Sequence, residues 1–180
     1  TGPRSPGRPV SRWLVLTGYM GAGKTAVGRR VADRLGRRFV DADRAVEERA
    51  GMPIPEIFAR RGELWFRRTE EAVVRELLAG EPGVLALGGG ALESRRTRDL
   101  VRRVADVVWL RASVEVAWGR VRGSDRPLAQ DRDRFARRAA AREAGYREAA
   151  GLEVDADAPA DEVAGRVAAW AEGLAAEARR

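Results

Sequence analysis

The chain has 180 residues, of which 44% are hydrophobic, and its 34 Lys and Arg residues outnumber 27 Asp and Glu residues to give a formal net charge of +7. Because it contains neither Cys nor His, disulfides, thiolate zinc sites, iron–sulfur clusters, cysteine nucleophiles and imidazole bases are excluded. The apolar content suffices for a core, and no apolar run approaches the roughly 18 residues of a membrane span, so we expect a cytoplasmic protein without a membrane partner.

The basic charge invites a nucleic-acid interpretation, but its distribution argues against one. The arginines are spread among acidic residues along the chain, and only two Tyr and four Phe are available for stacking on bases. We therefore predict no nucleic-acid partner, and keep a basic nucleic-acid-binding module as the alternative from another class. The single lysine, Lys24, marks a place where a compact ammonium does what a planar guanidinium cannot.

Taken in chain order, short apolar runs alternate with longer segments of helical spacing, which is the pattern of an α/β fold. The Pro-, Gly- and Arg-rich residues 1–10 are expected to be a flexible N-terminal segment, with a single domain over 11–180. Strands are predicted at 13–17, 39–40, 84–87, 107–110 and 152–154, and helices at 25–35, 63–79, 133–149 and from 159 onward. Further helical stretches break near 51–53 and 62, and the basic residues 95–103 are typical of a solvated helix face. Parallel pairing with right-handed crossovers follows. The polar residues 120–132 lose periodicity and predict a lid loop.

The strongest motif is Gly18–Thr25, which matches G-x-x-x-x-G-K-[ST] between a predicted strand and a predicted helix. Its glycines allow successive backbone N–H groups to face one concavity, so that Gly21, Ala22 and Gly23 together with the helix N-terminus would bind phosphates. Lys24 would neutralise the β- and γ-phosphates of ATP, and the Thr25 hydroxyl would ligate Mg²⁺. A glycine-rich turn without a ligand is the alternative.

Two carboxylates, Asp41 and Asp43, follow the second predicted strand, at the sheet edge where parallel α/β proteins bind ligands. Next to a magnesium nucleotide, one of them can hold the metal's water shell while the other orients and deprotonates an acceptor hydroxyl. The alternative is that Asp43 serves only as the N-cap of the following helix.

Gly88-Gly89-Gly90 ends the third predicted strand at the same edge of the sheet. Three glycines let a small ligand lie against bare backbone and use its N–H groups. A loop without a binding role is the alternative.

These segments together resemble the shikimate kinase family in order and spacing over about residues 12–175. The resemblance rests on the phosphate loop, the two aspartates, Gly62-Glu63 with Phe66-Arg67 and Glu70, the three glycines, Arg126-Pro127-Leu128, and Arg142 four residues before Tyr146. It implies a nucleoside-monophosphate-kinase-like fold, with a five-stranded parallel sheet flanked by helices and a lid. It also implies transfer of the γ-phosphoryl group of ATP to the 3-hydroxyl of shikimate. We expect Mg²⁺ as the cofactor and a monomer as the oligomeric state. Another small-molecule kinase of this fold, such as a gluconate kinase, is the alternative.

On the acceptor side, the resemblance makes Asp43 the partner of the shikimate hydroxyls and the candidate base. It implies that Arg67 and Arg142 bind the substrate carboxylate, that Glu70 holds Arg67, and that the Gly89 backbone contacts a ring hydroxyl. Guanidinium forks suit a carboxylate, so the chemistry agrees with these roles.

On the nucleotide side, the resemblance places Asp41 near the metal. It implies that Arg126 in the lid meets the transferring phosphoryl group and that Arg120 lies against the adenine.

Overall fold

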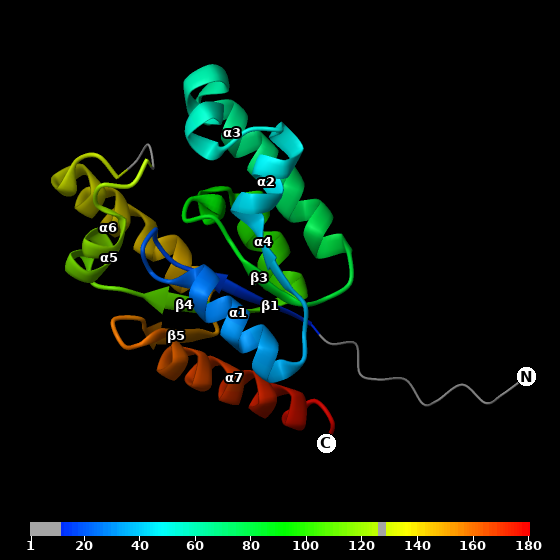
Figure 1. Ribbon diagram of the computed structural model, residues 1–180. Coiled ribbons are helices and arrows are strands. Elements are labelled where there is room, and N and C mark those ends of the chain that lie inside the picture. Colours follow the sequence, from blue (N-terminus) through cyan, green and yellow to red (C-terminus); the bar gives the residue numbers. More distant parts are fainter. Residues whose placement is uncertain (1–11, 126–128) are drawn as a thin grey trace, which may run out of the picture.

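A computed structural model describes residues 12–125 and 129–180, so the predicted flexible segment 1–10 lies outside the described residues. Within the described residues the chain forms a five-stranded, fully parallel sheet of order β2-β3-β1-β4-β5 (Figure 1). The strands are β1 (Trp13–Thr17), β2 (Phe39–Asp41), β3 (Val84–Ala86), β4 (Ala105–Arg111) and β5 (Leu152–Asp155). The predicted strands are confirmed. β4 extends beyond its predicted limits at both ends because it pairs with β1 on one side and β5 on the other.

Helices connect the strands, with bounds close to those predicted. They are α1 (Lys24–Leu35), α2 (Ala42–Ala50), α3 (Ile54–Ala79), the 3₁₀ helix η1 (Ala91–Glu93), α4 (Arg95–Val104), α5 (Val114–Val121), α6 (Arg132–Ala149) and α7 (Ala160–Glu177). The predicted break at residue 62 is confirmed, because Gly62 has non-helical dihedral angles (φ 80, ψ 166) inside α3. Arg95 and Arg96 of α4 lie on a solvated face, as predicted, with side chains 86% and 90% exposed.

Both faces of the sheet are buried, which explains why its strands read as continuous apolar runs. Leu14 and Leu16 of β1 pack into a cluster with α1 and α7 on one face. Trp13 and Val15 point to the opposite face, where α3, α4 and α6 contribute to a second cluster. This period-two alternation fixes the register of β1, and with it the position of the loop that follows its last residue.

A third apolar cluster joins α2 to α3 at one end of the molecule, and its buried members are Val46, Ile57, Phe66 and Val73. In Figure 1 these helices lie at the top of the molecule, apart from α5 and α6, and α3 runs back along the sheet so that Leu78 meets Trp13 at the start of β1. The charged residues that α2 and α3 carry on their inner sides are brought to the sheet edge where the phosphate loop lies.

The lid predicted over residues 120–132 falls on the connection between α5 and α6, and its role as a lid stays a prediction. Helix α5 continues to Val121 and α6 begins at Arg132, so the connection spans 122–131. Of this connection, residues 126–128 lie outside the described part. The part of the chain that the structure describes contains no helix with the length and apolar character needed to cross a membrane.

Candidate active site

The loop Gly18–Thr25 leaves the end of β1 and enters α1, as its sequence predicts. Gly21 and Gly23 have φ angles of 81 and 87, in the left-handed region that glycine tolerates. A Cβ on Gly21 would lie 2.4 Å from the Ala117 carbonyl oxygen, so no side chain fits there. Gly23 is the N-cap of α1 and provides no side-chain cap. The first turn of α1 therefore offers its N–H groups to an anion.

Lys24 lies over this loop. Its Nζ donates hydrogen bonds to the Gly18 and Tyr19 carbonyl oxygens at 2.8 and 3.1 Å. The ammonium is thus held beside the concavity that the loop encloses, where phosphate charge would be neutralised.

Arg120, in the last turn of α5, lies against the same loop from the other side. Its guanidinium donates to the Gly21 carbonyl at 2.9 Å and to the Ala156 carbonyl, just after β5, at 3.1 Å. It therefore links the phosphate loop to the segment between β5 and α7. Contact with the adenine stays a prediction.

Asp41 connects the phosphate loop to α2. Its Oδ2 accepts a hydrogen bond from the Thr25 hydroxyl at 2.7 Å, and its Oδ1 accepts from the backbone N–H of Asp43 at 3.0 Å and of Arg44 at 3.4 Å. Asp41 is therefore the N-cap of α2. The alternative in which Asp43 serves as that cap is wrong, because the helix begins one residue before it and Asp43 lies in its first turn.

The pair formed by Thr25 and Asp41 fits a magnesium ion chemically. A hydroxyl and a carboxylate are hard oxygen donors of the kind Mg²⁺ prefers, and they meet beside the phosphate loop. The predicted metal residues are thus brought together.

A cleft of about 580 Å³ adjoins the phosphate loop and is lined by side chains of α2 and α3 on one side and of α6 on the other. The predicted site residues that line it are Thr25, Asp41, Asp43, Arg67, Gly89 and Arg142. Met20, Ile54, Phe58 and Phe66 supply apolar surface. The cleft therefore combines several guanidiniums and carboxylates with an apolar wall, which suits a small anionic molecule with hydroxyl groups.

The three glycines make room for the charged groups around them. A Cβ on Gly88 would lie 2.3 Å from Glu70 Oε1 and 2.7 Å from Asp43 Oδ1. On Gly90 it would lie 2.4 Å from Arg67 Nη1. These two positions admit no side chain while the polar groups stay in place, and the binding role of the glycine loop stays a prediction.

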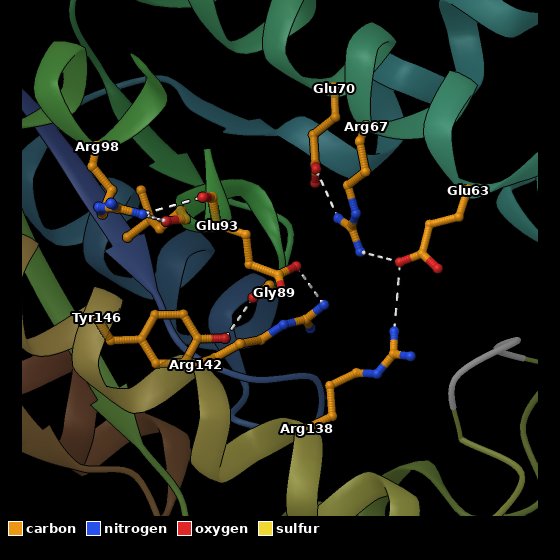
Figure 2. Close-up of polar contacts among 10 residues, drawn as sticks. Glu63, Arg67, Glu70, Gly89, Glu93, Arg98, Arg138, Arg142 and Tyr146 are labelled. Atoms are coloured by element: carbon orange, nitrogen blue, oxygen red, sulfur yellow. Dashed lines mark hydrogen bonds and ion pairs between the residues drawn. The ribbon is translucent and has the colours of Figure 1, made fainter. Parts of the chain in front are cut away.

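Glu70 and Arg67 form an ion pair along one face of α3, with Arg67 Nη1 2.8 Å from Glu70 Oε2 (Figure 2). Glu70 is only 3% exposed. Burial raises the pKa of the Glu70 carboxyl, Arg67 opposes this shift, and the nearby charge of Asp43 adds to it. Arg67 is thus held by a buried partner, as the resemblance implied.

Arg142 is also buried, at 5% exposure, although it comes from α6 on the other side of the cleft. Its guanidinium carbon lies 5.3 Å from the centre of the Tyr19 ring, and its Nη2 lies 2.8 Å from Glu93 Oε2. The Tyr146 hydroxyl donates to the Gly89 carbonyl and holds the glycine loop against α6 (Figure 2).

The sequence analysis assigned no role to Glu63, although Gly62-Glu63 is part of the motif, and it did not single out Glu93 or Arg138. Glu63 Oε1 lies 3.5 Å from both Arg67 Nη2 and Arg138 Nη1, which joins α3 to α6 across the cleft (Figure 2). Arg138 precedes Arg142 by four residues, so helical periodicity places both on one face. That spacing was a usable signal. Arg126, predicted to meet the transferring phosphoryl group, lies outside the described residues.

Comparison with known proteins points to one family. The family model described as shikimate kinase matches residues 20–172. The shikimate kinase of Nitrobacter winogradskyi is 51% identical over 144 residues, which cover 78% of this chain and 67% of that protein. The shikimate kinase of Symbiobacterium thermophilum is 46% identical over 150 residues, covering 80% and 86%.

Comparison with solved structures points to the same family. A shikimate kinase from Acinetobacter baumannii in complex with shikimate superposes with a TM-score of 0.87 at 34% identity, covering 91% of this chain and 94% of that one. A gluconokinase from Sinorhizobium meliloti covers 96% of this chain, but at a TM-score of 0.61 and 20% identity its likeness extends to the fold alone. With the phosphate loop, the paired aspartates, Arg67 and the buried Arg142 at one cleft, the chain belongs to the shikimate kinase family.

Proposed function

We propose that this chain transfers the γ-phosphoryl group of ATP to the 3-hydroxyl of shikimate, giving shikimate 3-phosphate and ADP. The observation that carries the proposal is one cleft lined by Asp43, Arg67 and Arg142 together with Met20 and Thr25 of the phosphate loop. Shikimate has one carboxylate and three hydroxyls on a small ring. The guanidiniums of Arg67 and Arg142 match the carboxylate of shikimate, and the Asp43 carboxylate and the glycine backbone match its hydroxyls.

At the nucleotide end, the loop and the N-terminus of α1 would hold the phosphates of ATP, and Lys24 would neutralise the β- and γ-oxygens. Arg120, which bonds to the loop carbonyl of Gly21, is our candidate for contact with the adenine. Arg126 would add a cation to the transferring group, in keeping with its place in the connection between α5 and α6. Phosphoryl transfer depends mainly on such positioning and on charge stabilisation.

Mg²⁺ would be held on the side of Thr25 and Asp41, directly or through water. When bound it would supply positive charge at the β- and γ-phosphate oxygens. Since Asp41 also caps α2, the same carboxylate would set the position of Asp43 relative to the nucleotide.

At the acceptor end, Arg67 and Arg142 would bind the shikimate carboxylate from α3 and α6, and the Gly89 backbone would contact a ring hydroxyl. Asp43 would orient the reacting hydroxyl and accept its proton, because the chain has no His or Cys to do so. All of these residues come from one chain, and a monomer remains our prediction.

The experiment is a steady-state assay of ADP formation with Mg²⁺, comparing shikimate, gluconate and CMP as acceptors. We expect shikimate to stimulate ADP formation strongly and the other two to do little. Stimulation by gluconate in place of shikimate would favour the alternative kinase. Salt-dependent binding to DNA or RNA without ATP turnover would favour the nucleic-acid-binding alternative.

A further inference from the structure

Arg142, the acceptor-site arginine of α6, already has a carboxylate partner from within the chain. Its Nη2 lies 2.8 Å from Oε2 of Glu93, at the end of η1 (Figure 2). The two side chains differ sharply in exposure, at 3% for Arg142 and 52% for Glu93. The arginine is therefore fixed in the protein, whereas the glutamate can rotate toward solvent.

Glu93 does not satisfy the whole guanidinium. Among the described residues, the Nε of Arg142 is buried and has no hydrogen-bond partner. A buried, charged donor without a hydrogen-bond partner raises the free energy of the folded protein. A carboxylate that binds the guanidinium through two hydrogen bonds, one of them from Nε, would satisfy this donor. A second carboxylate that also accepts a hydrogen bond from Nε would therefore bind Arg142 more favourably than Glu93 does.

We propose that Glu93 is a positioning residue that occupies Arg142 in the empty site and is displaced by the carboxylate of the acceptor. The inference rests on the proposed function, because it takes Arg142 to be an acceptor-carboxylate site. Two carboxylates at one guanidinium repel each other, so the exposed Glu93 is the one that leaves. An acceptor without an anionic group cannot displace Glu93 from Arg142 in this way. Glu93 would therefore favour acceptors that carry a carboxylate.

Three other glutamates near the cleft or near Arg142 form their ion pairs with other arginines. Glu63 and Glu70 pair with Arg67, and Glu63 also lies beside Arg138. Neither has a hydrogen bond or ion pair to Arg142 among the described contacts. Glu143, although adjacent to Arg142 in the sequence, has its ion pair with Arg147 at 3.9 Å.

The test compares Glu93→Gln and Glu93→Ala with Glu143→Gln, which removes the same charge one residue from Arg142. Shikimate affinity is measured by titration without ATP, and KM and kcat by steady-state kinetics. We expect both Glu93 variants to bind shikimate about two- to five-fold more tightly, the scale of an exposed ion pair, with KM for shikimate falling in parallel. The KM for ATP should be unchanged in all variants, and Glu143→Gln should match the unaltered protein.

A second comparison separates competition for Arg142 from a merely structural role. In an Arg142→Ala background, Glu93→Gln should no longer change the affinity for shikimate, because the two carboxylates then have nothing to compete for. Unchanged or weaker shikimate binding by both Glu93 variants, or an equal gain in Glu143→Gln, would overturn the inference. Absence of shikimate-dependent ADP formation in the unaltered protein would instead refute the proposed function.

Discussion

The Thr25 hydroxyl donates a 2.7 Å hydrogen bond to the Asp41 carboxylate, which ties the start of α1 to the end of β2. The other oxygen of the same carboxylate caps α2. A single side chain therefore connects the phosphate loop to the helix that carries Asp43. Under the proposed function, this one carboxylate would position both the nucleotide side and the acceptor side of the site.

Replacing Asp41 should separate its two roles. Asn is as good an N-cap as Asp, so Asp41→Asn should keep the stability of the fold while raising the Mg²⁺ concentration needed for half-maximal turnover. Asp41→Ala should lose the cap as well and destabilise the protein by about 1 kcal/mol. Urea unfolding and Mg²⁺ titration of ADP formation measure the two effects. An Asn variant with an unaltered Mg²⁺ requirement would argue against the metal role.

Lys24→Arg should be severely impaired although it keeps the charge. The Lys24 ammonium lies within 2.8 Å of the Gly18 carbonyl, and a broad guanidinium does not fit that position. We expect turnover to fall by at least roughly 100-fold, the scale of removing one preorganised donor. The control is Arg30→Lys in the same helix, where the arginine bonds only to the Ala26 carbonyl among the described contacts. Near-normal turnover of Lys24→Arg would reject its role.

Glu70 should make the stability of the protein depend on pH in a defined direction. Burial raises its pKa above 4.5, so the folded state binds this proton more tightly than the unfolded state does. The stabilisation from protonated Glu70 is complete below about pH 4.5, the ordinary pKa of a glutamate, and is lost as the pH rises through the raised pKa. The free energy of unfolding of the unaltered protein, minus that of Glu70→Gln, should therefore decrease over this range and then level off. A flat or rising difference in urea unfolding experiments would contradict the shift.

Asp43→Asn should remove most turnover and leave ATP binding nearly intact. The variant keeps the size of the side chain, and the cap of α2 is untouched because Asp41 provides it. A loose transition state needs little base catalysis, so positioning contributes as well, and we expect a loss of roughly 10²- to 10⁴-fold. Asp33→Asn, on the exposed face of α1, is the matched control. More than about a tenth of normal turnover at saturating shikimate would reject Asp43 as the base.

Much of the site could be predicted because its motifs follow strands. The sheet edge collects whatever comes after β1, β2 and β3, so the phosphate loop, Asp41, Asp43 and the three glycines were expected near one another. The choice between Asp41 and Asp43 as helix cap was not predictable, since it depends on a helix boundary of one or two residues.

The ion pairs across the cleft were harder to foresee. Glu93 of η1 pairs with Arg142 of α6, and Glu63, directly after the break in α3 at Gly62, pairs with Arg138 of α6. Neither pairing has a local sequence signature. Periodicity indicates which residues share a face of a helix, but not which neighbour that face meets.

The most direct test of the account is to identify the product of a complete turnover. The protein is incubated with ATP, Mg²⁺ and shikimate, and the phosphate ester is located by phosphorus–proton correlation NMR. We expect one ester, at the 3-hydroxyl, formed in equal amount to ADP and greatly reduced in Asp43→Asn. ADP accompanied by inorganic phosphate alone, or an ester at a different hydroxyl, would contradict the account.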